Sequence, residues 1–147
     1  MNVTEYLRRY ERADRKAQRL LEEYKRENEL VDAVRSTADI DGLPKGTGIS
    51  KETEEKALRL ADKAALFKMA QLDALHERQE VANTIFKVKD PDEQDVLVER
   101  YINYGQTWEE ICVKLHMSWG TVHNKHRQAK TTVAVILNTK SCIELDI

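Results

Sequence analysis

The segment from Ile111 to Lys140 has a charge pattern suited to nucleic-acid binding. It contains no Asp or Glu, although the whole chain has a formal net charge of -2. A Lys or Arg that neutralises a DNA phosphate releases condensed counterions, which favours binding. The pattern therefore predicts a surface that faces phosphates, with an ordinary solvated helix face as the alternative. The basic and imidazole side chains of the segment are Lys114, His116, His123, Lys125, His126, Arg127, Lys130 and Lys140.

Side chains near the middle of this segment are of types that read DNA bases. If a helix with about 3.6 residues per turn begins at Trp119, Val122 and Ala129 face inward. Asn124 then faces outward and can pair bidentately with adenine, while Arg127 can reach guanine or a phosphate. The complete outward arc is Trp119, Gly120, Thr121, His123, Asn124 and Arg127.

The other positions on and beside this arc have less specific expected roles. Thr121 can touch a thymine methyl group or a phosphate, and Gly120 lets the backbone come close to DNA. Trp119 either contacts DNA or folds back on the core. Lys125 and Lys130 suit phosphates better than bases. The full candidate DNA-binding set is Thr107, Ser118, Trp119, Gly120, Thr121, His123, Asn124, Lys125, Arg127 and Lys130.

Two helices and a turn are predicted to hold these side chains. Thr107 and Glu110 have the spacing of a capping box, which predicts a helix over 108–115. A turn over 116–118 follows, and Ser118 is suited to cap the next helix, which we expect to reach about Leu137. Ile111 and Leu115 should face Val122 across the turn. The tail over 138–147 has no clear pattern.

A further helix is predicted ahead of this pair. Asp90 and Pro91 are typical of a helix start, and we expect the helix to run to about Asn103. Gly105 is then expected to end it as a left-handed C-cap. The apolar side chains that this helix should bury are Val96, Leu97, Tyr101 and Ile102.

The first part of the chain predicts two long helices. Apolar residues recur at three- and four-residue steps over 3–34, with Thr4 as N-cap. Glycines and a proline predict a loop over 36–50. A second helix is expected from a cap at Ser50 or Thr53 to about Phe86, with two apolar strips. One strip has heptad-like spacing and consists of Leu58, Ala61, Ala65, Leu72, Leu75, Ala82 and Phe86; the other consists of Leu60, Ala64, Phe67, Ala74, Val81 and Ile85.

The two long helices are expected to pair antiparallel, within one chain or across a dimer. The predicted organisation is an all-α chain with a coiled-coil-like region over 1–88, a helix-turn-helix domain over 89–138 and a tail over 139–147. A content of 34% charged and 6% aromatic residues favours solvated helices over a large sheet core. No apolar run approaches the roughly 20 residues of a membrane span, and no signal peptide is recognisable, so we expect a cytoplasmic protein.

The combination of motifs in the last third resembles region 4 of sigma-70 factors. The matching positions are Arg100, Tyr101, Gly105, Thr107, Glu110, Ile111, Leu115, Ser118, Val122 and Ala129. The whole layout is similar to phage-encoded transcriptional activators of the RinA and ArpU type. This resemblance implies an activator of late genes of a phage or related mobile element, with double-stranded DNA as a partner. Host RNA polymerase, and a second copy of the chain bound through the N-terminal helices, are further expected partners.

Other classes of function are less well supported by the sequence. Cys112, His116, His123 and His126 are metal-ligand types, but no cysteine pair has zinc-site spacing, so we expect no metal and no cofactor. Cys112 and Cys142 are expected to be free thiols. No phosphate-binding glycine loop or nucleophile elbow is present, which argues against an enzyme. The remaining alternative is a helical adaptor that contacts proteins, in packaging or at the polymerase, without binding DNA.

Overall fold

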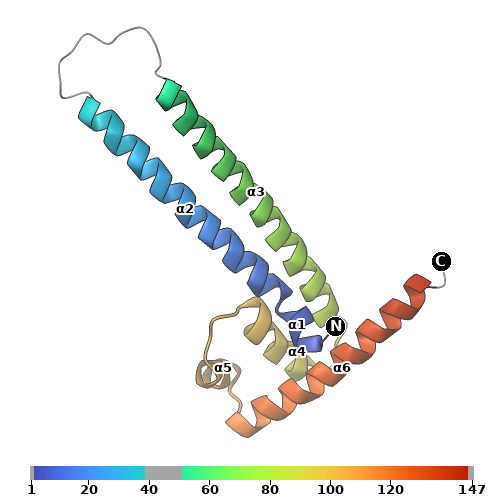
Figure 1. Ribbon diagram of the computed structural model, residues 1–147. Coiled ribbons are helices and arrows are strands. Elements are labelled where there is room, and N and C mark those ends of the chain that lie inside the picture. Colours follow the sequence, from blue (N-terminus) through green and yellow to red (C-terminus); the bar gives the residue numbers. More distant parts are fainter. Residues whose placement is uncertain (1, 39–50, 146–147) are drawn as a thin grey trace. The chain divides into compact units, whose positions relative to one another are not determined.

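The structure is a computed structural model that describes residues 2–38 and 51–145, with side chains placed for 2–33 and 51–141. Every regular element in these residues is a helix, so the expected all-α class is confirmed. None of the described helices is long and apolar enough to cross a membrane. In chain order (Figure 1) the elements are α1 (Val3–Leu7), α2 (Arg9–Ala38), α3 (Lys51–Ile85), α4 (Pro91–Leu97), the π-helix η1 (Val98–Ile102), α5 (Trp108–Leu115) and α6 (Trp119–Leu145).

The chain divides into two compact units. The first unit comprises residues 1–13 and 74–147, and the second comprises residues 14–73. This division differs from the expected boundary between 88 and 89, because α1 and the end of α3 share a core with the C-terminal helices. That first core contains Tyr6, Leu7, Val81, Ile85, Val88, Leu97, Tyr101, Ala129 and Val133.

The single helix expected over 3–34 is interrupted near its start. Arg8, with φ -84° and ψ 0°, separates α1 from α2. Asn2 rather than Thr4 is the N-cap, since its side chain accepts a hydrogen bond from the Thr4 N–H at 3.1 Å. The short helix α1 buries Leu7 completely and brings the Tyr6 hydroxyl to 2.7 Å from Thr84 Oγ1 on α3. The interruption therefore belongs to a segment anchored in the first core.

Within the second unit, α2 and α3 run antiparallel (Figure 1) and are linked by an ion pair between Glu27 and Lys63. Ala17 and Ala70 are buried. The expected antiparallel pairing is thus formed within one chain. Residues 36–38 are helical, which differs from the loop expected over 36–50, and residues 39–50 lie outside the described residues.

The strip of α3 expected to form a heptad-like seam does not form the buried face. Leu58, Leu72, Leu75 and Phe86 are all exposed, and Phe86 lies beyond the end of the helix. The other apolar strip forms the buried face instead. Its members Leu60, Ala64 and Phe67 are half-buried, and Ala74, Val81 and Ile85 are buried. Thr53 is not the N-cap, since α3 begins at Lys51, and Ser50 lies outside the described residues.

The helix expected over 91–103 changes its winding partway. Asp90 caps α4 as predicted, with its side chain accepting a hydrogen bond from the Asp92 N–H at 2.9 Å. After Leu97 the chain widens into η1, where the Asn103 N–H donates to the carbonyl of Val98 at 2.9 Å. The π-helix therefore ends at Ile102, with Asn103 as its C-cap. Gly105 has the expected positive φ of 97°, but it lies in the loop beyond the cap.

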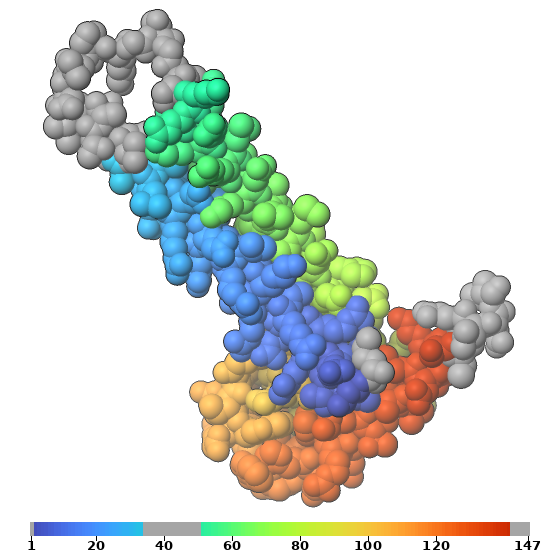
Figure 2. Space-filling model, in the orientation of Figure 1, coloured from blue at the N-terminus to red at the C-terminus, as the bar shows by residue number. Residues whose placement is uncertain are grey.

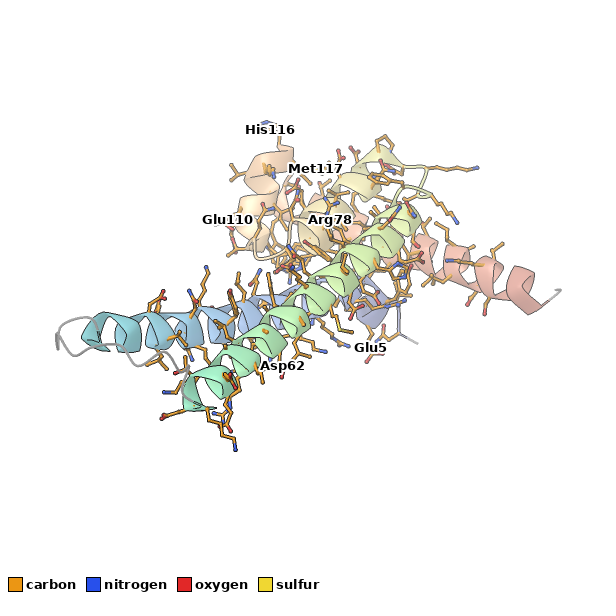
Figure 3. All side chains as sticks on the ribbon, turned by 90° about the horizontal axis from the view of Figure 1, so that it is seen from above. Glu5, Asp62, Arg78, Glu110, His116 and Met117 are labelled. Carbon is orange, nitrogen blue, oxygen red and sulfur yellow. The ribbon has the colours of Figure 1, made fainter. Side chains whose placement is uncertain are left out.

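The helices α5 and α6 begin where the sequence predicts. Thr107 and Glu110 form the capping box, with the Thr107 N–H donating to Glu110 Oε2 at 2.7 Å. His116, in the left-handed conformation with φ 55°, ends α5, and Figure 3 labels Glu110, His116 and Met117 along this part of the chain. The helix α6 continues to Leu145 instead of stopping near Leu137, so most of the tail expected to lack a pattern is helical. No proline or glycine occurs after Gly120 to end it.

Candidate nucleic-acid interface

A small second core fixes α5 against the start of α6. Val96 from α4, Ile111 from α5 and Val122 from α6 are fully buried against one another. Leu115 packs on this cluster, as expected. Ser118 caps α6 because its Oγ accepts a hydrogen bond from the Thr121 N–H at 3.3 Å. The first turns of α6 are therefore held at a fixed place on α5.

Most of the polar side chains expected to read DNA lie on the solvent-exposed face of α6. Gly120, Thr121, Asn124 and Arg127 are exposed, and the early turns of α6, in orange, lie on the surface in Figure 2. Neither the Asn124 amide nor the Arg127 guanidinium has a side-chain partner among the described residues. Trp119 does not fold back into the core, because 57% of the residue is accessible.

The expected role of His123 as an exposed reader is not met. Its ring lies between Trp119, with centroids 3.7 Å apart, and Trp108, with centroids 4.5 Å apart. Its Nε2 is buried without a hydrogen-bond partner. The half-buried His123 ring is therefore engaged in packing against Trp119 and Trp108.

His126 is part of the packing between α6 and η1. Its Nε2 lies 2.9 Å from the Tyr101 hydroxyl, and its ring stacks on Tyr101 and meets Trp108 edge-on. Burial, followed by the positive charges of Lys130 and Arg100 and by His123, lowers the pKa of His126 from 6.5 to about 4. The imidazole is therefore neutral at pH 7. A neutral ring can accept the phenol hydrogen.

The segment without acidic residues meets carboxylates from other parts of the fold. Lys125 Nζ lies 2.8 Å from Asp90 Oδ2, which lowers the pKa of Asp90 and raises that of Lys125. Two further ion pairs of this kind join Lys114 to Glu99 at 2.8 Å and Lys140 to Glu80 at 3.4 Å. Lys125 is thus not a free phosphate contact. Among the described residues of the segment, Arg127 and Lys130 are the two strong cations without an ion-pair partner.

Glu99 is the hub of a polar network that ties η1 to α5. It is 8% exposed and accepts hydrogen bonds from Asn103, Gln106 and Lys114. Burial alone would raise the pKa of Glu99, but the hydrogen bonds from Lys114, Gln106 and Asn103 outweigh it and lower the pKa. The network keeps a carboxylate charged beneath the loop that leads to Thr107.

Two exposed residues that we did not single out continue the arc along α6. Gln128 and Thr131 follow Asn124 by four and seven positions and are exposed like it. The same helical periodicity that identified Asn124 could have found them. Thr107 is exposed, but its hydroxyl is engaged in the capping box.

The described residues contain no group of three or more His, Cys, Asp or Glu placed to hold a metal ion. Cys112 is a half-buried free thiol beside the second core. The side chain of Cys142 lies outside the described residues.

Comparison with known proteins identifies one family. The family described as "Protein of unknown function (DUF722)" matches residues 11–135. No curated protein and no solved structure matches the chain.

Proposed function

Since the chain belongs to the DUF722 family, whose description gives no activity, we propose from the geometry of α6 that it binds double-stranded DNA and regulates transcription. The observation that carries the proposal is the exposed arc of Thr121, Asn124 and Arg127 on a helix whose start is held by a buried core. Two helices joined by a tight turn are the arrangement of helix-turn-helix proteins, which place the second helix of the pair, here α6, in the major groove.

The first turn of α6 adds an electrostatic argument. It contains no acidic residue, and the free N–H groups of a helix start attract phosphate. Asn124 suits adenine and Arg127 suits guanine or phosphate. Because three lysines of the segment are already paired with carboxylates, we expect few phosphate contacts from α6 and correspondingly modest non-specific binding.

From the resemblance to RinA- and ArpU-type activators we further propose that the protein acts in the cytoplasm on late genes of a phage or related mobile element, with host RNA polymerase as a partner. Self-association through the N-terminal helices is supported by exposed apolar side chains on the second-unit part of α3, namely Leu58, Leu66, Met69 and Leu72.

Binding of the purified full chain to DNA tests the proposal against the adaptor alternative. Fragments from the surrounding genome and a duplex of random sequence are titrated across about 50 to 200 mM salt. We expect affinity to weaken as salt rises and one fragment to be preferred. Equal, negligible binding to every duplex would favour an adaptor that contacts only proteins.

The Gly120→Ala variant tests whether the start of α6 contacts DNA without weakening the fold. A Cβ at Gly120 meets nothing within 4 Å, so the protein has room for it. Because alanine is the better helix former, thermal unfolding should show unchanged stability or a gain of up to about 1 kcal/mol. If the backbone at Gly120 approaches DNA, the added methyl group should weaken binding about tenfold, or about 1.4 kcal/mol. Undiminished binding would show that this turn does not touch DNA.

A further inference from the structure

The loop over 86–90, between α3 and α4, presents two lysines on a well-fixed backbone. Val88 is buried in the first core, and Lys87 and Lys89 on either side of it are exposed. The Lys87 N–H donates to the carbonyl of Thr84 at 3.2 Å, and the Val88 N–H donates to that of Ile85 at 3.0 Å. The lysine side chains therefore extend from a backbone whose position is set by the core.

This loop ends beside the proposed recognition helix. Asp90, its last residue, forms the 2.8 Å ion pair with Lys125 of α6, which is the neighbour of Asn124 in the chain. The helix α4, which follows the loop, also contacts α6, because the Thr132 hydroxyl donates to Glu93 Oε2 of α4 at 3.2 Å. The loop thus flanks the same helix on which the proposed base-reading residues lie.

The charges of the loop remain available to a ligand. Neither Lys87 nor Lys89 forms an ion pair with any described residue. The nearest acidic residue in the chain, Asp90, already accepts from Lys125 and from the Asp92 N–H. The loop therefore combines two unpaired ammonium groups with a carboxylate that is occupied elsewhere.

We propose that Lys87 and Lys89 bind backbone phosphates of the DNA strand that borders the groove occupied by α6. A helix in the major groove has a phosphate strand on each side, and contacts to these strands position a protein without reading sequence. The inference rests on the proposed DNA binding and adds the element that supplies phosphate contacts, which α6 itself largely lacks.

The salt dependence of binding tests this assignment. A short duplex of random sequence is titrated with the full chain and with a Lys87→Gln/Lys89→Gln variant over about 50 to 200 mM salt. Loss of two phosphate contacts should reduce the slope of log affinity against log salt by about 1.8. A Lys87→Arg/Lys89→Arg variant should keep the wild-type slope, since the charge is retained.

A matched control removes the same charge elsewhere. Lys51→Gln/Lys68→Gln changes two exposed lysines of α3 and should leave the slope unchanged. If the wild-type chain binds DNA and the Lys87→Gln/Lys89→Gln variant has the same slope, the loop proposal is wrong while DNA binding stands. If the wild-type chain binds no duplex at any salt, the proposed function fails and the loop proposal fails with it.

Discussion

Ile111→Ala should destabilise the first unit by about 2–5 kcal/mol, the usual cost of emptying a fully buried aliphatic site. Ile111 is completely buried between Val96 of α4 and Val122 of α6, so the missing atoms leave a cavity where three helices meet. Chemical denaturation followed by circular dichroism measures the loss. Because this core fixes α6 on α5, DNA affinity should also fall under conditions in which most of the protein is still folded.

Val113→Ala is the matched control on the same helix. Val113 is 76% exposed and belongs to neither core. Its truncation should change the free energy of unfolding by no more than about 0.5 kcal/mol. An Ile111→Ala variant as stable as Val113→Ala would contradict the second core as the element that holds α6.

Lowering the pH from 7 to 4 should cost about 2–3 kcal/mol of stability through His126. Its pKa is about 4 in the folded protein, below its ordinary value of 6.5, because burial and nearby positive charge disfavour the protonated ring. Between these values the unfolded chain binds a proton that the folded chain does not, so stability decreases as pH falls through this window. Each pKa unit corresponds to about 1.4 kcal/mol, and the loss of stability levels off only when the pH is well below 4, where the folded protein is protonated as well.

Denaturant unfolding at a series of pH values measures this effect. His126→Gln should make the free energy of unfolding depend less on pH between about pH 4 and 6.5, because the titrating ring is gone. His76→Gln changes an exposed histidine of α3 and should leave the profile as in the wild type. A His126→Gln profile that decreases as steeply as that of the wild type would show that other groups cause the acid sensitivity.

Local signals explain which elements could be predicted from the sequence. The bounds of α5, the turn over 116–118 and the start of α6 depend on caps within three or four residues, such as Thr107 with Glu110 and Ser118 with Thr121. These contacts are fixed by neighbouring residue types and need no knowledge of the fold. The inward positions of α6 likewise follow from helical periodicity, and Val122, Ala129 and Val133 are buried.

Long-range contacts explain most of what the sequence could not predict. Asp90 and Lys125 are 35 positions apart, and Glu80 and Lys140 are 60 apart. The carboxylate partners of the segment over 111–140 therefore could not be predicted from the residues within it. Similarly, α3 has two apolar strips, and only the packing of neighbouring helices decides which one is buried. The π-helix η1 has no signature in residue type that separates it from a regular helix.

If α6 reads DNA bases through Asn124 and Arg127, replacing either residue by alanine should reduce the preference for one DNA sequence. Competition between a preferred genomic fragment and its scrambled counterpart is measured for each variant, with Asn138→Ala on α6 and Arg78→Ala on α3 (Figure 3) as controls at exposed positions. Each test variant should lose about 1–3 kcal/mol of discrimination between the two fragments while unfolding like the wild type, and the controls should lose none. Discrimination that survives in both test variants at the wild-type level would contradict the assignment of α6 as the helix that reads DNA.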